Sequence, residues 1–583
     1  MPPKRKNVGK SKKASGAAAA APVAAPVVAP EPVVPEVPAT PVISTTPVGL
    51  ALGNDFVTIA LHRNNGAEVI VNEDGERATP AWVAYTTRYV EETEEDTPAD
   101  EEPAKPETEV ILGTTAQRQF LRNMQHTIPE VMRLLAFMDD PEGAQKAKSL
   151  QKWPFSITER APTADDPSRI AVELNLEHLE ETQLVTPTEL LAALIGGLKG
   201  TAEGILSSIV REAVLSVPTN LTEVQLAAIR SAADKCGLKL SALISEPAAA
   251  ALALLDEEPL VSAEPENILV FDFGGSSVST TVLRRYVGET FEIVASKVDT
   301  ATGARALDDL LANHLLRDIS RKLADISDNR RAMIKLRMEC ERIKRTLSQS
   351  TTAPVFVESL HDGMDFAGSN MSRSHFEVLI TPMIQSLLNS VDSFLTVSNI
   401  PLKSIQRVIL TGGGSAIPLV QRKFSELFGE GVPVIREQNN PQETVARGAA
   451  LHAFHLFDQL KPAADEPLPE LPTVCADNEL RALTKAVGLA GADGKFVPLL
   501  PAGTAVPVAI SVTCEVAGDD KASILSIVAG DSETAAENTS ALDIMIPASA
   551  GPEVNLLLSV DRAGSVSARI TSNDGSEVVS VSA

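Results

Sequence analysis

The chain contains few cysteines and few aromatic residues, and these shortages exclude several classes of protein. Its 583 residues include 4 cysteines, which lie too far apart along the chain for a metal knuckle or a disulfide framework. Aromatic residues make up 4% of the chain and hydrophobic residues 44%, so aliphatic side chains have to form most of the core. The cysteine usage predicts a reducing compartment, and the cytosol fits best.

Long apolar runs are also missing. No run approaches the length of a membrane span, and the N-terminus lacks the apolar segment of a secretory signal. No membrane partner is therefore expected.

Acidic residues outnumber basic residues, and the net charge is −26. Nucleic-acid binding depends on Lys and Arg neutralising phosphates, so a general nucleic-acid binder is excluded. Residues 1–13 form a basic exception, which we interpret as an inert tail, with contact to ribosomal RNA as the alternative. Residues 91–109 are strongly acidic and predict a solvated surface loop, with docking of a basic partner as the less favoured alternative.

The length and the changes in composition predict several folding units. Residues 1–46 are first basic and then rich in Ala and Pro, which predicts a disordered arm. Strand and helix patterns alternate over 47–460, prolines interrupt 461–474, and only short alternating strands follow over 475–583. The order predicts an α/β domain, a proline-rich linker and an all-β sandwich with no helix after it.

Recurring patterns within the α/β part predict a duplicated core. A strand is expected at Val48–Leu52, and a helix at Pro187–Leu206 with Thr186 as its N-cap. One long charged helical stretch is expected over 304–350. The order of strand, glycine turn and helix then recurs over 405–455, as it would in a two-fold repeated α/β unit.

Glycines follow three of the expected strands, at Gly53, at Gly274 and Gly275, and at Gly412–Gly414. Without a Cβ, such turns let backbone N–H groups approach phosphate oxygens. A single turn of this kind is more often an ordinary turn. Three of them in this order predict a nucleotide cradle.

The sequences of several segments resemble those of the ATPase domain of the 70-kDa heat-shock (Hsp70) chaperones, which has the actin and sugar-kinase fold. The segments are Val71-Asn-Glu-Asp-Gly-Glu-Arg-Ala-Thr-Pro80, Ile244-Ser-Glu-Pro-Ala-Ala-Ala250, Glu341-Arg-Ile-Lys-Arg-Thr-Leu-Ser348 and Asn440-Pro-Gln-Glu-Thr-Val-Ala-Arg-Gly-Ala449. The resemblance covers nearly everything from Val48 to Ala583. It implies an actin-like, two-lobed ATPase domain followed by a peptide-binding sandwich, here short and without the helical lid.

The resemblance also implies an ATP site. Adenosine would be held by Glu341, Lys344, Arg345 and Ser348, whose spacing places them on one helix face; an exposed charged helix is the alternative. Mg²⁺ is possible, with Asp272 acting through water. The other implied contacts to the nucleotide are Gly53, Asn54, Asp55, Glu246, Asp272, Gly274, Gly275, Ser276, Ser277, Gly303, Gly412, Gly413, Gly414 and Ser415.

The family's catalytic positions are replaced. Its first-motif aspartate corresponds to Ala51, its catalytic lysine to Gln117 and its second-motif aspartate to Ser279. Its stacking arginine corresponds to Ala416, and Asp55 would repel phosphate. Because these groups act together on the transferred phosphate, their loss predicts a slow or absent ATPase and no catalytic residues.

Among family members, the chain most resembles the Ssz-type chaperones of the fungal ribosome-associated complex, which pair stably with the J-protein zuotin. This implies a cytoplasmic, ribosome-associated, ATP-binding subunit that does not hydrolyse ATP and that acts as co-chaperone for a catalytic ribosome-bound chaperone; its sandwich would bind a nascent peptide. Two alternatives remain. One is an active ATP-hydrolysing chaperone that uses Asp55, Asp272 and Glu246, and the other is a small-molecule kinase of the same fold.

Overall fold

The computed structural model describes most of the chain between residues 47 and 582. The predicted arm 1–46 and linker 461–474 lie outside the described residues, as does 91–104 of the predicted acidic loop. The described residues are 47–63, 66–90, 105–150, 153–163, 166–256, 258, 260, 265–286, 290–437, 440–459, 481–482, 485–491, 494–500, 505–506, 508–515, 523–530, 532, 534–547, 553–560, 566–572 and 577–582.

Two sheets share one strand order. In the first, β3 (Gly66–Val69), β2 (Phe56–Arg63) and β1 (Val48–Leu52) are antiparallel, and β11 (Glu212–Val217) and β12 (Lys239–Ser245) continue parallel to β1. The second sheet repeats this pattern with β15 (Thr290–Asp299), β14 (Val278–Tyr286), β13 (Glu266–Phe273), β20 (Arg407–Thr411) and β21 (Val434–Arg436). The prediction of a duplicated core is confirmed.

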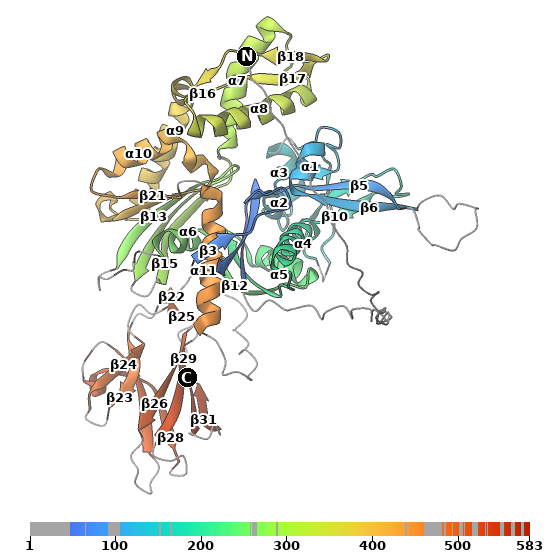
Figure 1. The fold of residues 1–583 in the computed structure, drawn as a ribbon. Coiled ribbons are helices and arrows are strands. Elements are labelled where there is room, and N and C mark those ends of the chain that lie inside the picture. Colours follow the sequence, from blue (N-terminus) through green and yellow to red (C-terminus); the bar gives the residue numbers. More distant parts are fainter. Residues whose placement is uncertain are drawn as a thin grey trace, which may run out of the picture. The chain divides into compact units, whose positions relative to one another are not determined.

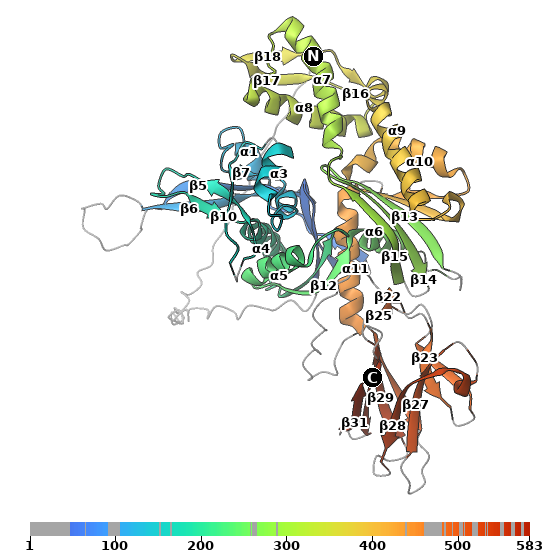
Figure 2. The same ribbon diagram turned by 180° about the vertical axis from the view of Figure 1, so that it is seen from behind.

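Each sheet has its own hydrophobic core. The first lobe comprises β1 to β12, and its core includes Leu50, Leu134 and Leu215. The second lobe comprises β13 to β21, and its core includes Phe271, Leu311 and Phe424. Figures 1 and 2 show the first lobe in blue to cyan-green and the second in green to orange.

Two helices, α6 (Glu246–Leu255) and α11 (Thr444–Gln459), pack against strands of both sheets (Figure 1). The backbones of the two helices approach closely, since a Cβ on Gly448 of α11 would lie 1.8 Å from the carbonyl oxygen of Ala249 in α6. Helix α11 also approaches β1, since a Cβ on Gly49 would lie 2.1 Å from the nitrogen of Ala450. These contacts fix the strand ends that carry the glycine turns.

The helix signals in the sequence are confirmed for α4 (Pro187–Leu206). Thr186 caps it in a complete capping box with Glu189, and proline opens the first turn. The single helical stretch predicted over 304–350 is wrong, because it divides into α7 (Arg305–Lys322) and α8 (Arg330–Gln349). Asn329 is the N-cap of α8, and its side-chain oxygen accepts a hydrogen bond from the backbone N–H of Ala332. The chain therefore turns between the two helices.

Strand β6 (Lys105–Leu112) pairs with β5 (Val83–Val90), so residues 105–109 are extended where a loop was predicted.

One described helix, α9 (Arg373–Val397), has the length and apolar composition of a membrane span, but its Ile380 and Val391 are buried in the second lobe. The remaining elements of this part are β4 (Thr79–Pro80), α1 (Gly113–Gln119), β7 (Thr127–Ile128), α2 (Val131–Leu135), α3 (Gly143–Leu150), β8 (Ile157–Glu159), β9 (Ile170–Leu174), β10 (Gln183–Val185), α5 (Glu223–Lys235), β16 (Thr352–Ala353), β17 (Phe356–His361), β18 (Met364–Ala367), β19 (Met371–Ser372), η1 (Leu402–Ser404), η2 (Gly413–Ala416), α10 (Pro418–Phe428) and η3 (Pro441–Glu443).

Eight of the C-terminal strands form two four-stranded sheets around one core, and the other two, β22 and β25, pair with each other. One sheet has the order β24-β23-β27-β28 and the other β26-β29-β30-β31, and Ile527 and Ile544 of the first share a core with Leu556 and Ile570 of the second. Between the described elements of this part, the only helical segment is the short η4 (Ala535–Glu537). The strands are β22 (Arg481–Ala482), β23 (Val487–Ala490), β24 (Phe496–Leu500), β25 (Ala505–Val506), β26 (Val508–Glu515), β27 (Ser523–Ala529), β28 (Thr539–Ile546), β29 (Glu553–Val560), β30 (Val566–Ser572) and β31 (Glu577–Ser582).

Candidate nucleotide-binding site

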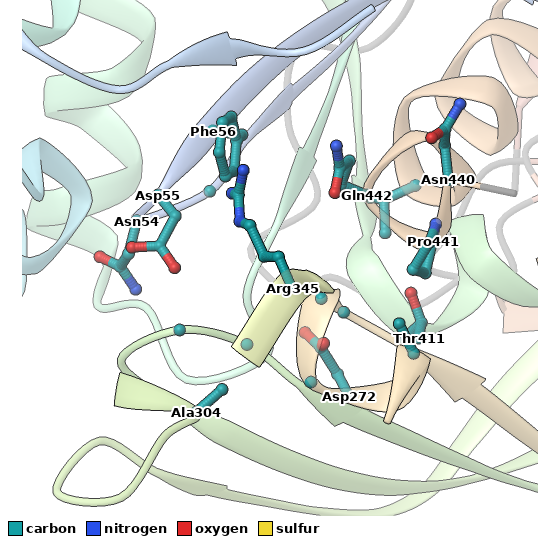
Figure 3. A pocket seen from close by; sticks show the side chains of 18 of the residues that line it. Asn54, Asp55, Phe56, Asp272, Ala304, Arg345, Thr411, Asn440, Pro441 and Gln442 are labelled. Carbon is teal, nitrogen blue, oxygen red and sulfur yellow. The ribbon is translucent and has the colours of Figure 1, made fainter. Parts of the chain in front are cut away.

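A cavity of about 440 Å³ lies where the three glycine turns meet α8 (Figure 3). It is formed by residues from both lobes, since β1 and β2 supply one wall and β13, β20 and α8 supply others. The predicted site residues that line it are Ala51, Gly53, Asn54, Asp55, Glu246, Asp272, Gly274, Gly275, Glu341, Lys344, Arg345, Ser348, Gly412, Gly413 and Gly414.

The other predicted residues lie behind the lining or away from it. Ser277 lies against Gly274, and the Ser415 hydroxyl donates to the carbonyl of Gly412 over 2.7 Å. A Cβ on Gly303 would lie 2.3 Å from the Gly275 oxygen, so this glycine permits contact with the turn rather than with the cavity. The Ser276 hydroxyl donates to Glu130 Oε1 over 3.3 Å.

Two of the three replaced catalytic positions do not line the cavity. Gln117 lies on α1, and Ser279 lies on β14 opposite Asp272 in the strand register. Ala51 lines the cavity with a methyl group.

The glycine turns are needed for close packing as well as for access. Gly412 has φ +78°, and a Cβ there would lie 2.1 Å from Asp272 Oδ1 and 2.6 Å from the Phe273 oxygen. A Cβ on Gly413 would have no atom within 4 Å, so this residue faces open space. The turn therefore presents backbone groups to the cavity without obstruction, as an anion nest requires.

Two acids, Glu246 and Asp272, lie at the inner end. Burial raises the pKa of both carboxyls, and the charge of Asp272 raises the pKa of Glu246 further. Asp272 Oδ1 and Asn54 Oδ1 are buried and have no hydrogen-bond partner among the described residues. These oxygens fit a hydrated Mg²⁺, which prefers oxygen ligands and keeps several waters. The described residues include no cluster of three or more His, Cys, Asp or Glu side chains that could hold a metal ion.

The α8 face forms the wall predicted to hold adenosine. Lys344 Nζ donates to Asp308 Oδ2 over 2.7 Å and to the Ala304 carbonyl over 3.0 Å. The Arg345 guanidinium lies 4.8 Å from the centre of the Phe56 ring, and both side chains border the cavity (Figure 3). A planar cation and an aromatic ring at this wall suit a flat base.

Sequence reasoning missed several lining residues. Phe56 directly follows the first turn, and Asn440 and Gln442 belong to a quoted family segment, so position alone could have indicated them. Arg305 and Glu130 are not lining residues, but Arg305 pairs with Glu130 and with the lining residue Asp55, and no local pattern links residues so far apart. The additional lining residues are Phe56, Thr58, Ala304, Gln349, Thr411, Arg436, Asn440, Pro441, Gln442 and Val445. Ala416, at the position of the family's stacking arginine, lines the cavity as the resemblance implied.

Similarity to known proteins decides the family. The family profile described as "Hsp70 protein" matches residues 47–582. The chain belongs to the Hsp70 family. Its mixed α/β architecture is consistent with the Hsp70 nucleotide-binding fold, as the resemblance implied.

Individual Hsp70 relatives are moderately similar. A "Heat shock 70 kDa protein" of Neurospora crassa is 30% identical over 82% of this chain and 67% of its own length. "Heat shock 70-related protein 5" of Dictyostelium discoideum is 27% identical over 84% of this chain and 91% of its own length. A heat shock protein of Pyricularia oryzae is 29% identical over 85% of this chain and 74% of its own length. The chain spans about two thirds of the length of the first of these relatives.

Proposed function

We propose that this Hsp70-family chain binds ATP in the cavity and does not hydrolyse it. The observation that carries the proposal is the composition of the lining. It retains the three glycine turns and the α8 face, but has Ala51 where the resemblance implies an acid. Binding groups are therefore retained while charged groups for the reaction are missing.

Phosphoryl transfer depends on positioning and on stabilising the developing charge, so each missing charge has a direct effect on rate. Gln117 lies outside the lining, and two of the lining cations already have anionic partners: Lys344 with Asp308, and Arg345 with Glu341 Oε1 at 3.2 Å. Glu246 and Asp272 remain, and Asp272 could hold Mg²⁺ through water. The ion would neutralise phosphate charge there.

We further propose the Ssz-type role for the whole protein. In this role the chain pairs stably with a zuotin-like J-protein, associates with the ribosome in the cytoplasm, and assists a catalytic chaperone that folds nascent chains. Its acidic composition supports pairing with a basic partner. The two-sheet sandwich supports contact with an extended peptide through a sheet edge.

The test is single-turnover hydrolysis of radiolabelled ATP, measured beside equilibrium ATP binding with and without a J-protein. We expect binding without conversion. ATP hydrolysis at the rate of a known Hsp70, abolished by Asp272→Asn, would overturn the proposal and favour the active chaperone. Co-purification of the tagged chain with a J-protein and ribosomes tests the proposed complex separately.

The active chaperone is the second candidate, because the buried acids Glu246 and Asp272 are both present in the cavity. The kinase alternative is set aside, since the family match continues through residue 582.

A further inference from the structure

A charged cluster lies beside the part of the cavity that Asp55 and Gly275 line, and nothing in the proposed function requires it. The Arg305 guanidinium, at the start of α7, forms ion pairs with Asp55 and with Glu130. Asp55 lies in the turn between β1 and β2, and Glu130 directly precedes α2. Figure 3 shows Asp55 on the strand turn that faces Ala304, the neighbour of Arg305.

The two ion pairs join different hydrophobic cores. Asp55 and Glu130 belong to the first lobe, where Val57, two residues after Asp55, and Val131, next to Glu130, are core residues. Arg305 belongs to the second lobe, because Leu307 and Leu311 of the same helix are part of that core. Arg305 therefore links the lobes across the cavity rather than stabilising one of them.

Arg305 is held firmly on its own lobe. Its backbone N–H donates to the Gly275 carbonyl over 2.9 Å, and the Ala304 N–H donates to the Gly274 carbonyl over 2.9 Å. The contact between Gly303 and Gly275 adds to this attachment. The backbone of Arg305 is thus attached to the glycine turn at Gly274 and Gly275, which lines the cavity.

Glu130 is held with similar precision on the other lobe. Its side chain is 5% exposed, it takes a left-handed conformation with φ 58°, and the Trp153 Nε1–H donates to its Oε2 over 3.1 Å. Ser276, from the glycine turn of the second lobe, donates to its other oxygen. A buried carboxylate of this kind is costly without a cation, so separating the lobes would leave Glu130 poorly compensated.

A second guanidinium crosses the same boundary. Arg133 of α2 donates to the Ser276 carbonyl over 2.9 Å and to the Thr300 carbonyl over 2.5 Å. Asp55 itself lies against the second lobe, since a Cβ on Gly275 would meet its carboxylate. A protein carboxylate thus occupies space at the turn that would otherwise be open to an anion.

We propose that Arg305, through Asp55 and Glu130, is a latch that holds the two lobes together in the absence of nucleotide. In a cleft without such a latch, the phosphates of a bound nucleotide supply the negative charge that both lobes contact. Here the protein supplies that charge from Asp55 and Glu130. The closed arrangement therefore does not depend on a bound triphosphate, and this inference is independent of whether ATP is hydrolysed.

The test is hydrogen–deuterium exchange of the nucleotide-free full-length chain, followed in peptides that contain residues 130–134 and 274–277. We expect slow exchange in the wild type that changes less than twofold on addition of saturating ATP. Arg305→Ala should increase exchange in both peptides at least tenfold, and ATP should restore protection. Arg337→Ala is the matched control, because Arg337 pairs with Asp309 within the second lobe.

Two results would overturn the latch. One is unchanged exchange in Arg305→Ala, and the other is wild-type exchange that slows at least tenfold only when ATP is added. If Arg305→Ala does not fold, Asp55→Asn provides the second variant, because the Asp55 side chain is partly exposed, and it should increase exchange in the 274–277 peptide several-fold. ATP affinity, measured in parallel, separates failure of the latch from failure of the proposed nucleotide site.

Discussion

Lys344 and Asp308 form an ion pair at the wall of the cavity, with Nζ and Oδ2 2.7 Å apart and side chains only 12% and 8% exposed. Burial raises the pKa of Asp308 to about 7, and the charge of Lys344 opposes this rise. The second carboxylate oxygen, Oδ1, has no hydrogen-bond partner among the described residues. Asp308 therefore depends on Lys344, which has a structural role as well as its predicted contact with adenosine.

Replacement of Lys344 should lower stability. Lys344→Met leaves the Asp308 carboxyl buried without its cation, which typically costs about 3 kcal/mol. Urea unfolding of the nucleotide-free protein would measure the loss. The double variant Lys344→Met/Asp308→Asn should recover part of it, and an additive loss in the double variant would contradict the dependence.

Replacement of Arg345 should affect ATP binding rather than stability. Its side chain is 53% exposed, so Arg345→Met should change the free energy of unfolding by less than about 0.5 kcal/mol. If the wall holds adenosine, loss of the guanidinium beside Phe56 should weaken ATP binding about tenfold, equivalent to about 1.4 kcal/mol. Isothermal titration calorimetry measures this, and unchanged affinity would place adenosine elsewhere.

The acid Glu246 should make stability depend on pH. Its pKa is raised above its ordinary value of 4.5, so the folded state binds the proton more tightly than the unfolded state. The resulting stabilisation is complete below pH 4.5 and is lost as the pH rises through the raised pKa.

The neutral variant Glu246→Gln has no carboxyl to ionise, so it does not lose this stability as the pH rises. It should be more stable than the wild type at pH 8, by about 2 kcal/mol, and the difference should shrink towards pH 5. Thermal unfolding of both proteins across this range, without nucleotide, measures the difference. A difference that stays constant with pH would show that the Glu246 carboxyl does not titrate in this window.

Neighbouring glycines in the third turn provide a matched pair. Gly412→Ala should destabilise the chain by at least about 2 kcal/mol, because the residue has φ +78° and its Cβ would collide with Asp272 and Phe273. Gly413→Ala should leave the stability nearly unchanged, since its Cβ would meet open space. Thermal unfolding compares them, and equal losses would contradict the described turn.

Much of the site followed from local sequence. The helix α8 could be predicted to bring Glu341, Lys344, Arg345 and Ser348 to one face, because the helical repeat places residues three and four apart together. The glycine turns were likewise predictable, since only glycine permits the close approaches seen at Gly275 and Gly412. The break between α7 and α8 was missed, because the capping of Asn329 competes with a favourable helical composition.

The sequence by itself determined the repeated alternation of strands and helices, the glycine turns and the face of α8, since each depends on residues that are close together along the chain. Only the tertiary structure decided which distant groups meet. Asp55 and Arg305 are 250 residues apart, and no local pattern indicates that they pair. Their contact arises because two sheets, each with its own core, bring their glycine turns to the same cavity, where side chains of opposite charge from the two lobes meet.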